Sequence, residues 1–501
     1  MSQLLGIGLV VVLAAVYAVA LRMILRAPFR ALGVLVAGMA IHNFVLMVLL
    51  RLGTPTLLVR VFQAWKEGLL LVLFVLVVLM GYRAWLAGRM PRLRPIDLLM
   101  IAFTAVTLLY FLAPASLLHS QASFSQRLLG LRVLSLIPLL YLFGRVFPAR
   151  RRSDLAWVAA LLLGSAALVG AFGTIELWLV PTRVWLDWGV NGLSAWLGFT
   201  YHGPAGLPEN FFQTTAEGFL LRRMVSTYLS PLGVAYTGLL LVPIGVVLLF
   251  PRRALPRLPW WFAAVMLDLL LLGILFSVTR LALAALAAEF ALLYIVLRRR
   301  ALIVHTLLIA VAVLFMIYGY PRFGPLVDRS LQPVAHRGEV HIASSSDPSA
   351  REHLTQLLID LDFVRHHPLG AGLGSSIHRF GPSGGTGESA VFDVFGDVGA
   401  LGGLLYVAIY LGGLVYGARA FLRVRGDPLL AALPLTALIG GLALIPITLT
   451  SDVWSDFSVT FLFWWAVGSS VTLARSASAA QSASPTPAAG SGGLADDVVG
   501  L

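Results

Sequence analysis

The chain has 501 residues, of which 59% are hydrophobic and only 12% are charged, and it carries a formal net charge of +13 and no cysteine. Soluble domains contain about 25% charged residues, so this composition excludes an ordinary soluble protein and makes lipid the solvent for most of the chain. The lack of cysteine excludes disulfides, thiol catalysis and thiolate metal sites. Nucleic acid is not an expected partner, because the basic residues form short clusters between apolar runs and no single patch.

Thirteen apolar runs follow one another along the chain, and each approaches the length of about 20 residues that a helix needs to cross a bilayer. They are residues 4–21, 31–50, 68–82, 97–113, 131–147, 155–179, 229–250, 259–277, 281–297, 302–319, 398–418, 429–449 and 457–474. The first run lacks a basic n-region and a clear cleavage site, so we interpret it as a span and not as a signal peptide. The predicted fold class is an all-α polytopic membrane protein with about 13 transmembrane helices and a large extracytoplasmic helical loop.

Arginines mark every second connection between these runs. The clusters are Arg22/Arg26/Arg30, Arg83/Arg89/Arg92/Arg94, Arg145/Arg150/Arg151/Arg152, Arg252/Arg253/Arg257, Arg298/Arg299/Arg300 and Arg419/Arg423/Arg425. By the positive-inside rule these connections are cytoplasmic. The N-terminus is then expected outside and the C-terminus in the cytoplasm.

This topology predicts four parts. Residues 1–319 hold transmembrane helices 1–10, with an outer loop at about 181–228. Residues 320–397 form the large extracytoplasmic loop, and residues 398–475 hold helices 11–13. Residues 476–501 are rich in Ala, Ser, Pro and Gly and predict a disordered cytoplasmic tail.

Cations at the outer ends of spans are the first candidates for a site. Lys66 is the only lysine, Arg132 opens the fifth span, Arg222 and Arg223 precede the seventh, and Arg280 lies in a tight turn between spans 8 and 9. Each of them alone is explained as well by snorkelling to the interface. Together, at one membrane level, they predict a clamp for a multiply charged anion, to which the arginine fork is well suited.

The long outer loop begins with a predicted amphipathic helix over 347–366, in which Asp347 is the N-cap and Pro348 the first helical residue. Its expected apolar stripe, packed on the membrane domain, is Leu354, Leu357, Leu361 and Val364. Arg351 lies in the first turn, where the helix dipole favours an anion. A merely solvated polar face explains Arg351 equally well.

A tight loop and an acidic segment follow this helix. Glycines alternate in the stretch 367–374, yet no strand precedes it, so a nucleotide fingerprint is not expected. The adjacent His366 and His367 have no matching ligand pair at metal spacing, so no metal site is expected. In the helix predicted over 387–399, Glu388 is the candidate general base, although a dipole-stabilised N-terminal charge is an equal explanation. For Asp268 and Glu289, which lie mid-span, we expect interhelical pairing.

The order of these features resembles the O-antigen ligase and polymerase superfamily. The residues that carry the resemblance are Thr279-Arg280, Arg351, the stretch from His367 to Gly374, Trp65-Lys66-Glu67, Gly130-Leu131-Arg132 and the stretch from Arg223 to Thr227. The resemblance covers most of the chain in architecture, but each motif is short, so only their order and spacing are specific.

The resemblance implies a metal-independent membrane glycosyltransferase of the GT-C-like kind, without a cofactor, that uses an oligosaccharide linked to polyprenyl pyrophosphate. It implies that Arg280 and Arg351 grip the pyrophosphate, supported by Lys66, Arg132, Arg222 and Arg223. Glu388 is the expected base, with His367 as the alternative. The implied location is a bacterial inner membrane, and the implied partners are the lipid-linked donor, a glycan or lipid acceptor, and proteins that set chain length.

The sequence departs from the ligases of this family, because Glu388-Ser389 stands where a His-Asn pair is expected. This favours a polymerase of O-antigen or exopolysaccharide repeat units over a ligase acting on lipid A core. The other readings are a protein O-oligosaccharyltransferase, a peptidoglycan polymerase of the shape-and-division type, and a non-enzymatic flippase or exporter. The exporter is disfavoured because the sequence contains no related halves.

Overall fold

The computed structural model of the protein describes residues 2–482, except 90–91, 119, 150, 199, 216–218, 250–258, 332–347, 378–385 and 387–388. At 329, 348–352 and 475–482 only the backbone is described.

Twelve helical segments in the described part are long and apolar enough to cross a membrane, and a seventeen-residue apolar helix, α11, makes a thirteenth. The segments are α1 (Ser2–Arg26), η1 with α2 (Pro28–Arg30 and Ala31–Arg51), α4 (Trp65–Leu86), α5 (Pro95–Leu112), α6 (Phe124–Val146), α7 (Arg152–Leu179), α10 (Pro231–Leu249), α11 (Trp260–Phe276), α12 (Arg280–Leu297), α13 (Arg300–Phe323), α15 (Ala390–Val424), α16 with the π-helical turn η7 and α17 (Pro428–Leu435, Thr436–Gly440 and Gly441–Thr450) and α18 (Phe457–Ser482). Each corresponds to one predicted apolar run, so the all-α polytopic fold is confirmed.

Shorter elements lie in the connections. They are α3 (Thr56–Gln63), α8 (Arg183–Asp187), α9 (Val190–Leu197), α14 (Pro348–His366), the 3₁₀ turns η2 (Pro204–Gly206), η3 (Glu209–Phe211), η4 (Ser226–Tyr228), η5 (Arg329–Leu331) and η8 (Val453–Ser455), and the strands β1 (Phe212–Thr214) and β2 (Leu220–Arg222). The two strands form an antiparallel hairpin in which Phe212 pairs with Arg222. The predicted outer loop at 181–228 therefore contains two short helices and this hairpin, packed around Trp185 and Phe211.

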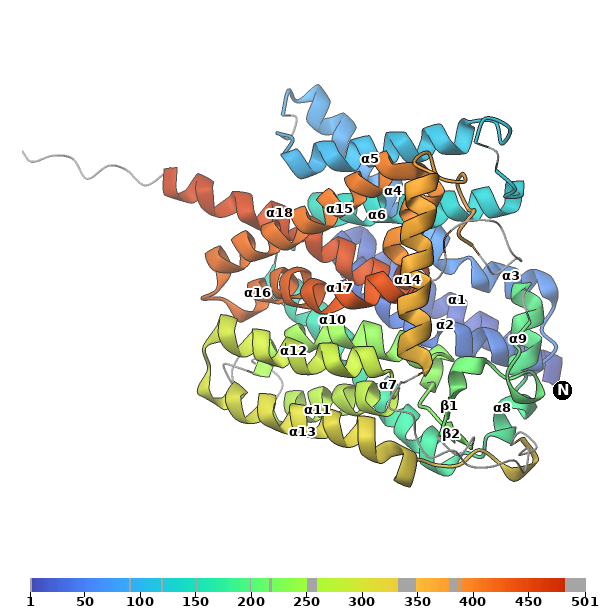
Figure 1. The fold of residues 1–501 in the computed structure, drawn as a ribbon. Coiled ribbons are helices and arrows are strands. Elements are labelled where there is room, and N and C mark those ends of the chain that lie inside the picture. Colours follow the sequence, from blue (N-terminus) through green and yellow to red (C-terminus); the bar gives the residue numbers. More distant parts are fainter. Residues whose placement is uncertain are drawn as a thin grey trace, which may run out of the picture.

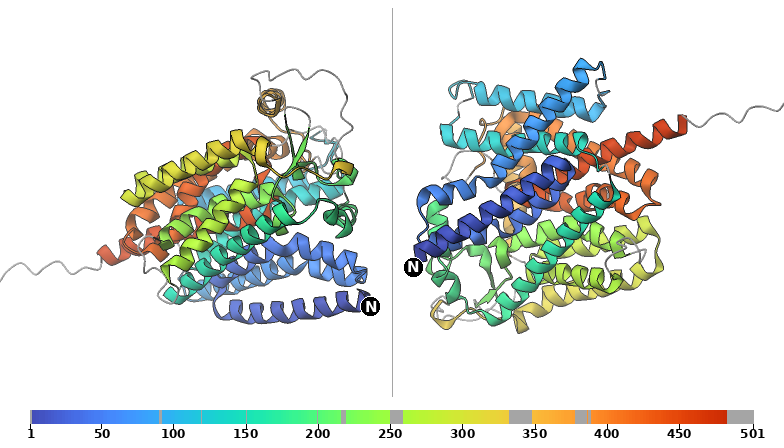
Figure 2. Two further views of the ribbon diagram at one scale, coloured as in Figure 1. Left: turned by 90° about the horizontal axis from the view of Figure 1, so that it is seen from below. Right: turned by 180° about the vertical axis from the view of Figure 1, so that it is seen from behind.

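The spanning helices run roughly side by side, with α10 almost wholly buried at the centre and α1 almost wholly exposed at the edge (Figures 1 and 2). A helix satisfies its own backbone polar groups, which is why apolar runs in lipid take this form. The N-terminus and the far end of α18 lie at opposite ends of the bundle, as an odd number of crossings requires (Figure 1). We call the end that carries α8, α9, α14 and the hairpin the α14 end.

The helix α14 crosses the spanning helices at a steep angle and packs on α15 and α17 (Figure 1). Its bounds match the prediction, but its predicted orientation is wrong in part. Leu354 and Leu361 are exposed, whereas Asp360 is 1% exposed and lies on the packed face with Leu357 partly covered. The side of α14 that packs on α15 and α17 is therefore the side that carries Asp360.

The helix α15 has two parts separated by a break at Val398 and Gly399, where Gly399 adopts φ 68° and ψ −177°. The first part is the acidic segment predicted from the sequence, and the second is the membrane-crossing part. A Cβ at Gly399 would approach the Pro368 carbonyl oxygen to 2.9 Å, so this close contact and the positive φ both require glycine. The Ala400 amide donates to that oxygen at 2.8 Å, which fixes the preceding loop in the break.

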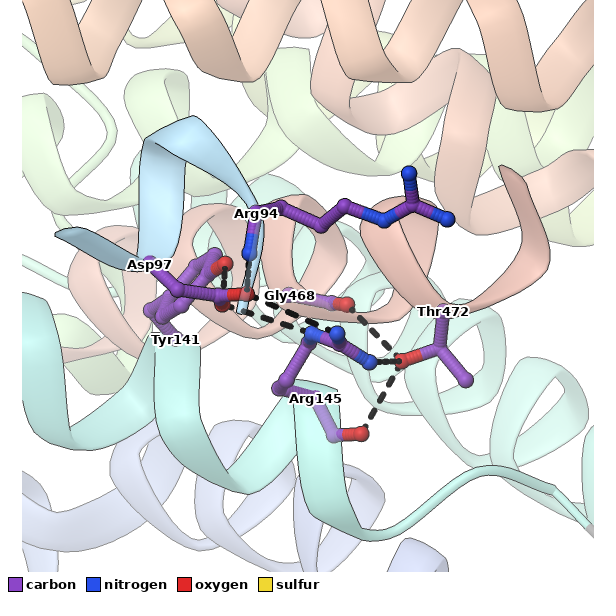
Figure 3. A network of polar contacts seen from close by, with 6 residues as sticks. All are labelled: Arg94, Asp97, Tyr141, Arg145, Gly468 and Thr472. Carbon is purple, nitrogen blue, oxygen red and sulfur yellow. Dashed lines mark hydrogen bonds and ion pairs between the residues drawn. The ribbon is translucent and has the colours of Figure 1, made fainter. Parts of the chain in front are cut away.

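A polar network joins α5, α6 and α18 at the opposite end of the bundle (Figure 3). Asp97, which is 8% exposed, caps α5 by accepting from the Arg94 amide at 2.7 Å. It also accepts a hydrogen bond from the Tyr141 hydroxyl and forms an ion pair with Arg145 at 3.4 Å. Arg145 reaches α18 through the Thr472 hydroxyl at 3.4 Å. The network therefore connects three helices where apolar packing gives no directional contacts.

The expectation of interhelical pairing has a different outcome for each mid-span carboxylate. Asp268 on α11 interacts electrostatically with His305 on α13, as expected. Glu289 on α12 is fully buried, and neither carboxyl oxygen has a hydrogen-bond partner among the described residues. The predicted interhelical pairing of Glu289 is therefore wrong, and a charge without a partner is too costly there, so the group is neutral. Asp268 lies on the exposed side of α11.

Candidate functional site

The glycine-rich loop after α14 lies at the α14 end, where α6 and α15 meet. Gly370, Gly372 and Gly374 all have positive φ, at 69°, 95° and 82°. Only glycine adopts such angles without strain, so the alternating glycines turn the chain sharply, as predicted. Asp397 on α15 fixes the turn by accepting from the amides of Gly374 and Ser376, both at 2.9 Å.

This loop presses directly on α6. A Cβ at Gly374 would overlap the backbone carbonyl of Gln126, and a Cβ at Gly130 would lie 2.7 Å from the Gly374 nitrogen. The two glycines therefore allow backbone to approach backbone. Because Arg132 follows Gly130 by two residues, the loop and Arg132 are positioned by the same stretch of α6.

Lys66 and Arg132 form a first cation pair around one carboxylate. Lys66 is 4% exposed, lies 3.5 Å from Glu67, and contacts His42 Nε2 at 3.4 Å. Arg132 forms an ion pair with the same oxygen of Glu67 and stacks 4.7 Å from the centre of the Phe457 ring. Two cations share one carboxylate, so this pair retains an excess of positive charge.

Arg223 and Arg280 form a second cation pair. The Arg223 guanidinium donates to the Ser277 carbonyl and to the Thr279 hydroxyl, both at 2.8 Å, and these acceptors belong to the turn that places Arg280 at the start of α12. Burial, together with a smaller effect of the nearby Arg280, lowers the pKa of Arg223 to about 10. Arg223 thus stays protonated at neutral pH, with only neutral hydrogen-bond acceptors among the described residues.

The neighbouring Arg222 has a different environment. Arg222 is 6% exposed and forms an ion pair with the buried Glu176 at 2.5 Å. It also donates to the carbonyl oxygens of Val180 and Glu176. Glu176 neutralises the charge of Arg222 within the protein. The structure therefore gives no support to the prediction that Arg222 helps to hold the anion.

The two cation pairs both adjoin the connection 451–456. Tyr236, which interacts electrostatically with Arg223, lies 3.1 Å from the Ser451 hydroxyl. At the other end of the connection, Asp456 precedes Phe457, over which both Lys66 and Arg132 lie. The pairs therefore belong to one region of the α14 end.

The predicted general base is flanked by anchored residues. Glu388 lies outside the described residues, and its role stays a prediction. On one side, the buried Thr386 hydroxyl donates to Asp393 Oδ1 at 3.2 Å. On the other, Ser389 caps α15 and donates to the Thr448 carbonyl at 3.2 Å, and the Ala390 amide donates to the Ser451 carbonyl at 3.1 Å. The chain near Glu388 is thus tied to the connection that adjoins both cation pairs.

Further carboxylates lie beside this segment, among them Asp393 and Asp397, which share one side of the helix predicted over 387–399. Asp393 interacts electrostatically with Asp452, Asp397 and Asp360, which come from three separate stretches of the chain. The sequence does not reveal that Asp360 is buried. Gln356 donates to it at 2.9 Å, but such a pair four residues apart forms on exposed helix faces as well. Asp393 is thus a second candidate for a base.

The predicted His367 lines a cavity of about 390 Å³ between the glycine-rich loop and the 117–121 connection, together with His366 and Gln121. Its ring stacks on Phe363 with 4.4 Å between centroids. Arg351 lies in the first turn of α14, but its side chain is outside the described part. The roles of both residues therefore stay predictions.

No group of three or more His, Asp or Glu side chains gathers within the described part in a way that could hold a metal ion. When the chain is compared with known proteins, no family model matches it, and no curated protein matches it. What is established is a multi-pass α-helical membrane protein.

Proposed function

We propose that the protein is a membrane glycosyltransferase that polymerises oligosaccharide repeat units carried on polyprenyl pyrophosphate. The observation that supports this best is the close approach of like charges at the α14 end, of Arg280 to Arg223 and of Arg132 to Lys66. Gathering like charges in a partly buried place is unfavourable unless an anion joins them, and a lipid diphosphate at the interface fits that need.

In the proposed reaction, the acceptor hydroxyl oxygen attacks the anomeric carbon of the donor sugar. The bond from that carbon to the pyrophosphate oxygen breaks, the hydroxyl proton passes to a carboxylate, and polyprenyl pyrophosphate leaves. Arg223 and Arg280 would neutralise the charge that grows on the leaving oxygen, the term that usually contributes most to such catalysis. Glu388 is the proposed base, and Asp393 is the alternative among the described carboxylates.

The choice of polymerase over ligase rests on the residues before α15, where Glu388-Ser389 replaces the His-Asn pair implied for ligases. Ser389 is committed to capping the helix and bonding the Thr448 carbonyl. It therefore has no hydroxyl hydrogen to offer an acceptor.

The test is the purified chain in detergent with an oligosaccharide on polyprenyl pyrophosphate and no membrane gradient. The expected product is a ladder of longer glycans on the carrier, with release of polyprenyl pyrophosphate. Arg223→Ala and Arg280→Ala should each lower the rate about 100-fold or more. The matched control is Arg322→Ala, which should leave the rate unchanged. Arg322 is an exposed arginine in the last turn of α13, at the α14 end of the bundle.

The alternatives give different products. A single transfer of preformed glycan to a lipid or protein acceptor would identify a ligase or an oligosaccharyltransferase. Movement of the donor across a vesicle bilayer without a new glycosidic bond would identify a flippase. Normal ladders from both alanine variants would refute the clamp.

A further inference from the structure

A second cavity, of about 680 Å³, lies at the opposite end of the bundle from the candidate site, and it is independent of the proposed function. It opens where α12 ends, where α15 ends and where α16 begins. Its walls are mainly apolar and include Val247 of α10, Ile295 of α12, Phe421 of α15 and Leu438 of η7. These walls come from four segments, so the hollow lies between helices and is more than a surface dent.

Three arginines line the same cavity: Arg298, Arg299 and Arg425. All three are exposed, and within the described part none makes an ion pair or a side-chain hydrogen bond. The nearby acid does not neutralise them, because Asp427 pairs with Arg152 at 2.6 Å and caps α16 by accepting from the Leu429 amide at 3.0 Å. The cavity therefore combines an apolar interior with uncompensated positive charge.

The backbone at Arg298 supports a role beyond topology. Arg298 ends α12 in the left-handed conformation, with φ 50° and ψ 37°, and Arg299 immediately precedes α13. A non-glycine residue in this region is strained, and such strain clusters at binding sites. The tight reversal between α12 and α13 brings both guanidinium groups to the cavity. A glycine at position 298 would adopt this backbone conformation more easily but would lack the charge.

We propose that this cavity binds one anionic glycerophospholipid, with its phosphate held by Arg298, Arg299 and Arg425 and an acyl chain along the apolar wall. Charge complementarity and the position between transmembrane helix ends both favour this ligand, since basic pockets between such ends suit acidic headgroups. A free phosphate would leave the apolar lining unused. The bound lipid would join α12, α15 and α16, and so stabilise this end of the bundle by mass action.

The experiment measures retention of phosphatidylglycerol and phosphatidylcholine by the delipidated full chain in detergent, by native mass spectrometry. Wild-type protein should retain phosphatidylglycerol in preference to phosphatidylcholine. The double variant Arg299→Gln/Arg425→Gln should weaken phosphatidylglycerol binding about 30-fold, the effect typical of two basic residues at an anionic lipid surface. The matched control is Arg300→Gln/Arg423→Gln, which removes two exposed arginines on the same side that do not line the cavity.

A second variant separates binding from folding. Arg298→Gly removes the charge but relieves the strained backbone, so thermal stability in lipid-free detergent should hold or rise while phosphatidylglycerol binding falls about 5-fold. Equal losses in the two double variants would show diffuse surface charge and overturn the proposal. If millimolar inorganic phosphate displaced phosphatidylglycerol, the cavity would be a site for free phosphate. If removal of residues 483–501 tightened lipid binding, the C-terminal tail would be the occupant of the cavity. Either result would also overturn it.

Discussion

The contact between the glycine-rich loop and α6 gives the sharpest test of the site architecture. Replacing Gly374 with alanine has two costs. The first is the left-handed backbone at φ 82°, which costs about 1–2 kcal/mol for a residue with a Cβ. The second is the overlap of that Cβ with the Gln126 carbonyl, and overpacking of this kind adds about 1–3 kcal/mol. The expected loss of stability for Gly374→Ala is therefore about 2–5 kcal/mol.

Gly53 provides the matched control, because its φ is 67° and no atom lies within 4 Å of a Cβ built there. Gly53→Ala should thus cost only the backbone term of about 1–2 kcal/mol. Stability is compared by denaturant unfolding of both variants in one detergent, under conditions where unfolding is reversible. Hydrogen exchange at 367–376 and 124–131 should rise in Gly374→Ala alone, because the loop and α6 separate.

The same variant tests the link to function. Displacing the loop moves it away from the stretch of α6 that ends at Arg132, so glycan polymerisation should fall in Gly374→Ala and stay normal in Gly53→Ala. If the two variants lose equal stability and show the same exchange, the loop does not press on α6 and the reasoning is refuted.

Three further predictions concern buried carboxylates. Asp97→Ala leaves Arg145 buried without its partner and should destabilise the protein by about 3–5 kcal/mol in denaturant unfolding. The control is Arg94→Ala, which should change the stability little. This variant keeps the backbone hydrogen bond to Asp97, and the Arg94 side chain extends away from the network in Figure 3. Glu289→Leu removes a buried group without hydrogen-bond partners in the described part and should raise stability by about 1–3 kcal/mol, whereas lost activity in a well-folded variant would show a functional proton instead. Burial raises the pKa of the Asp456 carboxyl from 3.8 to about 6, so the folded state holds the carboxyl proton more tightly than the unfolded chain does. The protonated carboxyl therefore contributes stability that is fully present below pH 3.8 and is lost as the pH rises through about 6. Asp456→Asn should reduce that slope in unfolding midpoints measured across this range, and the remaining slope belongs to Asp397, whose pKa burial also raises to about 6. An unchanged slope would contradict the assignment.

The sequence by itself was sufficient for the features that depend on local chemistry. Each spanning helix follows from a run of apolar residues long enough for a bilayer, because only a helix satisfies its own backbone there. The bounds of α14 follow from the Asp-Pro start and the helical spacing, and the positive-φ turns follow from the alternating glycines. The cations before spans 3, 5, 7 and 9 could also be located from the sequence, because each lies next to the start of an apolar run.

The pairing of those cations was not visible, because it depends on direction and distance in three dimensions. Arg222 and Arg223 are neighbours in the sequence, yet Arg222 meets Glu176 while Arg223 meets the turn before Arg280. Successive residues at the end of a strand point to opposite sides, and only the packing of the hairpin decides which side faces Glu176. Likewise, the apolar stripe predicted for α14 is not its buried face, because the packing of α14 on α15 and α17 places Asp360 inside and leaves Leu354 and Leu361 exposed.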